Sequence, residues 1–203
     1  MRRLFCLKIF LLIYCLMTSH ILRLFPNFSL HYKSSNMNLN DQVTKNIVHI
    51  FEQFNHSLLT TDENQINTIP FEDSWTIGQT ADHIIICSSG IPDEHTQVSE
   101  RPFDRHVSVL KEMFLNMELK FKADPSLLPR KNSYTKDELL EQMEINKSNL
   151  LKNIESMDLT LICTDMAFPQ IDYLTRYEWL SFIGFHTQRH LIQIENIKYK
   201  LTN

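Results

Sequence analysis

Apolar residues recur at helical spacing along most of the chain from Met37 onward. The first stripe takes steps of four and three residues, through positions 43, 47, 51, 54 and 58. Similar stripes cover 103–121, 139–157 and 179–197. No convincing alternation of apolar and polar residues interrupts them, and 159–163 is the one short strand candidate. The pattern predicts an all-α fold.

Local signals indicate where these helices begin. A capping box, in which a threonine and a Glu or Gln three residues later satisfy each other's backbone N–H groups, fits at 76–79, 135–138 and 175–178. Asn40 or Asp41 can cap the first helix, and Pro102 suits the first turn of a helix over 103–121. Long helices joined by loops predict an up-and-down four-helix bundle with extra short helices or turns.

The first 36 residues differ from the rest. They have a basic start and an apolar run interrupted by Lys8, without a small-residue cleavage site. We interpret 1–36 as a leader, either signal-like or translated from a misassigned start, and 37–203 as the bundle domain. A cytoplasmic protein without a membrane partner is then expected. Export or membrane anchoring is the alternative if the leader is a genuine signal.

Composition excludes several classes of function. A net charge of −4 provides no basic surface for nucleic acid, and three glycines are too few for phosphate-binding loops. The four cysteines lack CxxC spacing, so neither a disulfide framework nor a cysteine-based zinc finger is indicated. A reducing compartment is the plain interpretation.

The chemistry of the chain is expected where histidines interrupt apolar stripes. His186 and His190 lie four residues apart on the inward face of the last helix, one turn from each other. His83 lies in the second helix, before three isoleucines. Three histidines from two helices can hold one divalent metal and leave a coordination position open. The alternative is a set of structural histidines bonded to other polar side chains.

Other candidates rank lower. Cys87, one turn after His83, is a backup ligand, although a small buried cysteine is usually a packing residue. His106 is the backup histidine. Gln188, Arg189 and Gln193 on the last helix could line the pocket, although such residues on a helix are more often solvated. No catalytic residue is identified, because Thr187 stands where an HExxH protease has its glutamate.

Two segments carry a family resemblance. SWTIGQTADHI at 74–84 and FHTQRHLIQIENI at 185–197 resemble the second and last helices of the DinB-like family, and FPQIDYLTRYEWLSF at 168–182 resembles the approach to that last helix. Asp172-Tyr173 departs from the family, whose members often have a glycine-containing turn there.

The resemblance implies a four-helix bundle, often dimeric, with zinc or nickel held by His83, His186 and His190. Some relatives activate a low-molecular-weight thiol, such as bacillithiol, mycothiol or glutathione, and others are described as metal-dependent hydrolases. We therefore expect a metal-dependent thiol transferase with a thiol cosubstrate. A hydrolase and a non-enzymatic metal-binding bundle are the alternatives.

Overall fold

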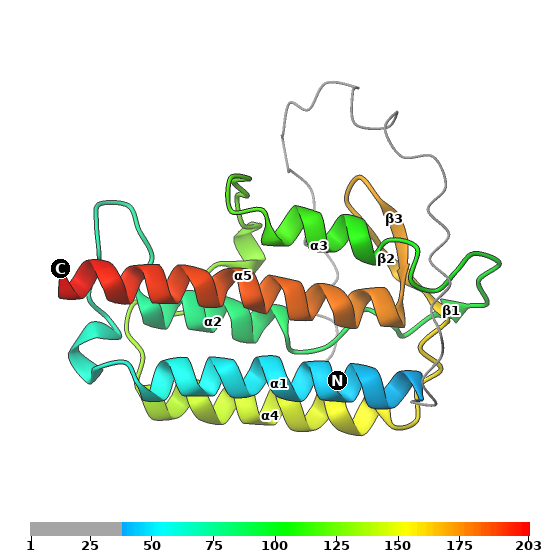
Figure 1. Cartoon of the computed structure of the whole chain (residues 1–203), viewed down its shortest axis with the longest axis horizontal. Coiled ribbons are helices and arrows are strands. Elements are labelled where there is room, and N and C mark those ends of the chain that lie inside the picture. The colour runs from blue at the N-terminus through cyan, green and yellow to red at the C-terminus, as the bar shows by residue number, and fades with distance from the viewer. Residues whose placement is uncertain (1–37) are drawn as a thin grey trace.

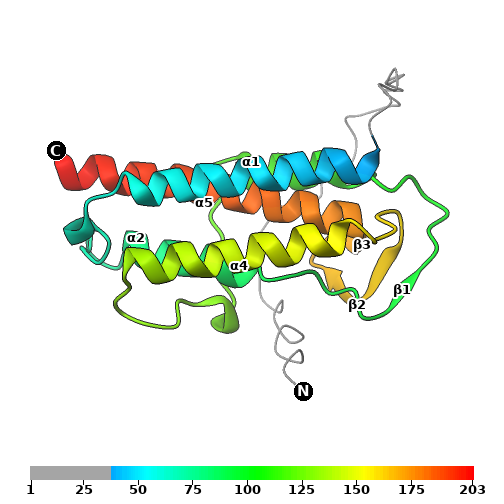
Figure 2. The same ribbon diagram turned by 90° about the horizontal axis from the view of Figure 1, so that it is seen from below.

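The computed structural model describes residues 38–203, in which four helices lie side by side (Figure 1). They are α1 (Leu39–Leu59), α2 (Ile77–Cys87), α4 (Lys136–Ile154) and α5 (Arg176–Thr202). Helices α1 and α2 each contact both α4 and α5, so the four surround one core. In both views α1 and α5 run in one direction and α2 and α4 in the other (Figures 1 and 2). The predicted helical bundle is confirmed.

The predicted capping boxes open three of these helices. At the start of α2 the Thr76 hydroxyl accepts a hydrogen bond from Gln79 N, and the Gln79 side chain accepts one from Thr76 N. The same reciprocal pair opens α4 and α5. Helix α1 begins earlier than predicted, because Asn38, rather than Asn40 or Asp41, is its N-cap.

A long connection returns the chain from the end of α2 to the start of α4. It contains α3 (Val107–Leu115) and a short 3-10 helix, η3 (Pro125–Leu127); another, η2 (Glu63–Gln65), follows α1. The predicted helix over 103–121 is thus too long, and Pro102 does not open it. Asn116 is extended, and the Arg189 guanidinium donates to the Phe114, Asn116 and Leu119 carbonyls. These tertiary bonds replace further helical turns.

A small antiparallel sheet lies at one end of the bundle, where the sequence suggested one strand at most. Its order is β1 (Thr96–Gln97), β2 (Ile162–Phe168), β3 (Asp172–Thr175). Gln170 and Asp172, in and after the turn, have φ angles of 64° and 134°, which favour glycine. This turn therefore has glycine-like backbone angles at residues that are not glycine. The sheet delivers the chain to the start of α5.

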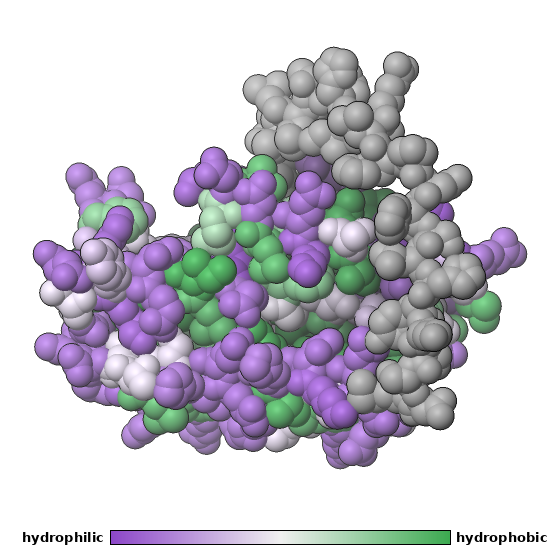
Figure 3. All heavy atoms as spheres, viewed as in Figure 1, coloured by the Kyte–Doolittle hydropathy of each residue, from purple (hydrophilic) through white to green (hydrophobic). Residues whose placement is uncertain are grey.

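The core lies between the four helices and contains apolar side chains from each of them, including Phe51, Ile84, Met143 and Ile194. On the face shown in Figure 3, hydrophilic side chains surround apolar ones gathered over α3 and α5. Among residues 38–203, no helix combines the length and the apolar character that crossing a bilayer requires. The predicted leader, 1–36, lies outside the described residues, and the predicted homodimer stays a prediction.

Candidate metal centre

The structure places His186 between the other two predicted ligands, His83 and His190. His83 projects from α2 toward His186 on α5, with their Nε2 atoms 3.2 Å apart. The Nε2 atoms of His190 and His186 are 3.1 Å apart. His83 and His186 are buried, at 4% and 7% exposure, and His190 is half-buried. Two zinc ligands at a bond length of about 2.05 Å and a tetrahedral angle are about 3.3 Å apart, so these separations suit a shared ion.

The outer ring nitrogens determine which nitrogen of two histidines carries the proton. His83 Nδ1 is 2.8 Å from the Leu127 carbonyl, which can only accept a hydrogen bond. His190 Nδ1 is 2.9 Å from Gln193 Oε1, also an acceptor. Both Nδ1 atoms therefore carry the proton, and both Nε2 atoms present a lone pair toward His186. Metal-binding histidines are commonly oriented by such a bond from the nitrogen that does not bind the metal.

His186 Nε2 cannot satisfy both of these lone pairs. A neutral imidazole carries one proton, so His186 Nε2 can donate to His83 or to His190, but not fully to both. In at least one of the two contacts, the lone pair of His186 Nε2 or its unshared side therefore faces the lone pair of another histidine's Nε2 atom, with no proton between them. A buried polar group without a partner costs about 1–3 kcal/mol. A cation between the three nitrogens removes this cost.

The electrostatic surroundings keep the three rings neutral. Burial lowers the pKa of His83, with the bond to the Leu127 carbonyl acting in the opposite sense. Burial lowers the pKa of His190 to about 3, and lowers that of His186 well below its usual range. The neighbouring histidines add to the shifts at His186 and His190. Neutral imidazole is the form that binds a metal, so all three are ready at neutral pH.

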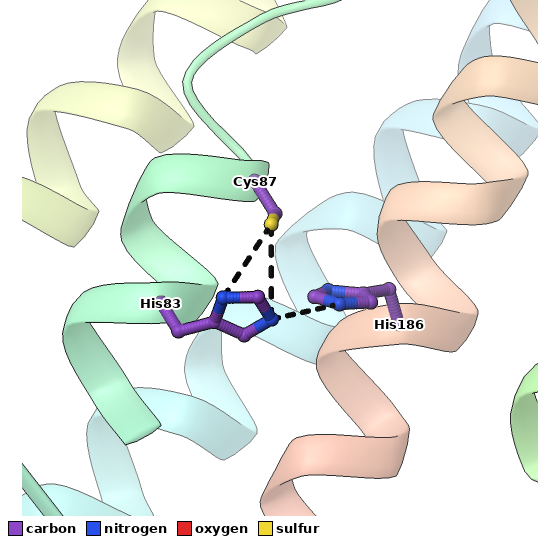
Figure 4. A group of neighbouring side chains, drawn as sticks. All are labelled: His83, Cys87 and His186. Atoms are coloured by element: carbon purple, nitrogen blue, oxygen red, sulfur yellow. Dashed lines mark hydrogen bonds between the residues drawn. The ribbon is translucent and has the colours of Figure 1, made fainter. Parts of the chain in front are cut away.

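Cys87 joins this cluster from the last residue of α2. Its Sγ atom is 3.9 Å from His83 Nε2 and points into the space beside the two rings (Figure 4). The ligand atoms of His83, Cys87 and His186 all lie within 4.8 Å of one another. This group can hold a metal ion. Within residues 38–203 this is the one group of three or more His, Cys, Asp or Glu side chains that meets that distance. The three histidines taken together do not meet it, and His190 adjoins the group through His186.

The remaining sequence candidates lie elsewhere. His106 is the N-cap residue of α3, where its backbone N–H donates to the buried carboxylate of Glu178. Glu178 also binds Arg101, and Glu195 accepts from Ser57, so neither carboxylate is an available base. The sequence left Gln193 either lining the pocket or solvated, and the structure places its side chain against His190. Gln193 lies three residues after His190, about one helical turn, and this spacing in the sequence is what could have predicted the hydrogen bond that orients the His190 ring.

The sequence did not indicate that Asp82, Arg130 and Tyr134 lie next to the histidines. Asp82, fully buried next to His83, accepts hydrogen bonds from the Arg130 guanidinium and backbone N–H and from the Tyr134 hydroxyl. Arg130 lies three residues after Leu127, whose carbonyl orients His83. Burial raises the pKa of the Asp82 carboxyl, but Arg130 and Tyr134 outweigh it and leave that pKa below its usual value. The pair therefore fixes the segment 127–130 against α2.

We expect Arg130→Ala to lower the free energy of unfolding by about 2 kcal/mol, because the buried Asp82 carboxylate loses the charged, partly exposed guanidinium and keeps only the Tyr134 hydroxyl and a backbone N–H as donors. Lys131→Ala is the matched control. It removes the neighbouring ion pair with Glu138, in which Lys131 is exposed and Glu138 nearly so, and should cost less than about 1 kcal/mol. Urea denaturation of both variants measures the difference. Equal losses would show that the Asp82–Arg130 pair contributes no more than a surface pair.

Comparisons with known proteins found similar sequences. A sequence model of the DinB superfamily matches residues 42–194, a range that includes the three histidines and Cys87. The chain is also similar to the uncharacterized protein YuaE of Bacillus subtilis (strain 168), with 24% identity over 143 residues, covering 68% of this chain and 86% of that protein. No solved structure matches the chain significantly.

Proposed function

Because this chain belongs to the DinB superfamily, we propose that it binds a divalent metal ion, zinc or nickel, through His83, His186 and His190 and activates a low-molecular-weight thiol. The observation that supports the proposal is that His186 Nε2 lies within 3.2 Å of the Nε2 atoms of His83 and His190, whose protons are held on their outer nitrogens. Three nitrogen ligands leave a coordination position for a further donor. A metal ion at this site supplies stabilisation of the thiolate, which is the attacking form of a thiol.

Thiol transfer is favoured over hydrolysis by the state of the carboxylates. Hydrolysis needs a general base to take a proton from water during the attack. The His83–Cys87–His186 group contains no carboxylate, and the neighbouring Asp82 is occupied by Arg130 and Tyr134. In thiol transfer the cosubstrate itself is the nucleophile. Its sulfur forms a bond to the electrophilic carbon, the leaving group departs with the bonding electrons, and the thiol proton passes to solvent.

The test uses the full chain loaded with Zn²⁺ or Ni²⁺, a panel of thiols (glutathione, bacillithiol and mycothiol) and a chromogenic electrophile. We expect a thiol-dependent rate that chelation abolishes and that His83→Ala lowers at least about 100-fold, since removing even an outer partner of a metal ligand costs 10–100-fold. Rates equal to those of His83→Ala with every thiol would refute thiol transfer. In that case, cleavage of an ester or amide panel would indicate hydrolysis. If chelation lowers the melting temperature and the protein shows neither thiol transfer nor hydrolysis, the ion is structural.

A further inference from the structure

The described part of the chain contains a fourth donor at the site, and it is itself a thiol. Cys87 lies one helical turn after His83, so both side chains leave α2 on the same face. Cys87 Sγ is 3.9 Å from His83 Nε2. A nitrogen and a sulfur that share a tetrahedral zinc ion are about 3.6 Å apart, given bond lengths of about 2.05 and 2.3 Å. The same sulfur is 4.0 Å from His83 Nδ1, so the Cys87 side chain must turn toward the Nε2 side of the ring to share an ion with Nε2.

Two of the four donors are more accessible than the others. His83 and His186 are buried, whereas Cys87, at the last residue of α2, and His190 are half-buried. In Figure 4 the Cys87 side chain lies at the end of α2, with its sulfur above the His83 ring.

From these contacts we propose that Cys87 is the fourth metal ligand in the resting protein, and that a thiol cosubstrate must displace it. The inference rests on the proposed function and deepens it, because it assigns the open coordination position to an internal thiolate. In the exchange the incoming thiol gives up its S–H proton and Cys87 regains one, so protons and charge balance. The chain then uses its own thiol to exclude other small donors until a competing thiol is present.

The ligand set also limits which ion the site prefers. A thiolate beside three imidazoles is a soft set of donors, suited to zinc and its neighbours among the transition metals and poorly suited to magnesium or calcium. A closed tetrahedral set further favours an ion without a preference for six ligands. Cobalt(II) is therefore an appropriate probe, since it accepts the same donors and reports a sulfur ligand by an intense near-ultraviolet charge-transfer band.

The experiment compares Co²⁺-loaded full chain, Cys87→Ser and Cys163→Ser without added thiol. Cys163 is the matched control, because it is fully buried in β2 and burial raises the pKa of its thiol to about 12. We expect the band in the wild type and in Cys163→Ser, and its loss in Cys87→Ser, which still takes up Co²⁺ with affinity reduced about 10-fold or more. Cys87→Ala repeats the test without a hydroxyl, and circular dichroism verifies folding.

A second measurement tests displacement. Glutathione added to Co²⁺-loaded Cys87→Ser should restore a sulfur band. The glutathione concentration that gives half of this band should be at least about 10-fold lower than the concentration that gives half of the maximal thiol-dependent rate of the wild type. A band that survives in Cys87→Ser, or is missing from the wild type, overturns the ligand assignment. Absence of Co²⁺ uptake by every variant overturns both proposals. A band that depends on Cys87, without turnover of any thiol, supports the ligand assignment and contradicts only thiol transfer.

Discussion

His186→Ala should weaken Zn²⁺ or Ni²⁺ binding at least about 100-fold, the largest loss expected from any single substitution in this chain. His186 Nε2 lies within 3.2 Å of the Nε2 atoms of both other histidines, so it is the common neighbour of the set. Removing it leaves His83 on α2 and His190 on α5 without the nitrogen between them. Loss of an outer partner alone costs 10–100-fold in metal affinity, and loss of a direct ligand should cost at least as much.

Isothermal titration against a competing chelator measures this affinity. His49→Ala is the control, because His49 is exposed on α1 and lies outside the cluster. Binding to the wild type should also raise its melting temperature as the free ion concentration increases, since a ligand that binds only the folded state stabilises it. An unchanged affinity in His186→Ala would remove His186 from the ligand set.

The metal-free protein should lose about 3 kcal/mol of stability between pH 7.5 and pH 5.5. The folded-state pKa values of His186 and His190 lie well below the usual 6.5 because both rings are buried. Below pH 6.5 the unfolded chain therefore binds protons that the folded chain does not, and stability falls as the pH falls. Each such group contributes about 1.4 kcal/mol over this interval.

Urea denaturation of chelated protein at the two pH values measures the change. His95 acts in the opposite sense. Its pKa is raised by the bond to Asp165, so its contribution is present below pH 6.5 and disappears as the pH rises through its folded-state pKa. His95→Ala separates this exposed pair from the buried cluster. A denaturation midpoint that stays constant from pH 7.5 to 5.5 would mean that the cluster takes up protons while the protein remains folded.

Sequence reasoning succeeded where the signal is local. The capping boxes at Thr76, Thr135 and Thr175 each involve residues three apart, so the starts of α2, α4 and α5 are contained in short stretches of chain. The sheet is different, because β1 has two residues and pairs Thr96 with Cys163, far along the chain. The apolar stripe beyond Leu115 likewise belongs to a loop, in which Phe121 stacks on Phe114.

The same distinction applies to the site. His83, His186 and His190 are visible in the sequence because each interrupts an apolar helical stripe, and Cys87 is visible one turn after His83. The Leu127 carbonyl carries no signal, since every residue has one. Asp82 and Arg130 are 48 residues apart, and nothing in the sequence pairs them. The candidate ligands could therefore be proposed from the sequence, whereas the orientation of their rings depends on contacts that form only on folding.

The positions of the ligands along the chain have a consequence for kinetics. His83 and His186 are separated by 103 residues, so an ion bound to both ties the second helix to the last across half of the polypeptide. A covalent link that closes a loop of about 100 residues lowers the entropy of the unfolded ensemble, which raises its free energy by about 4.7 kcal/mol at 25 °C. An ion that dissociates slowly acts as a similar link. Its residence time then governs how long the folded chain survives heat or proteases.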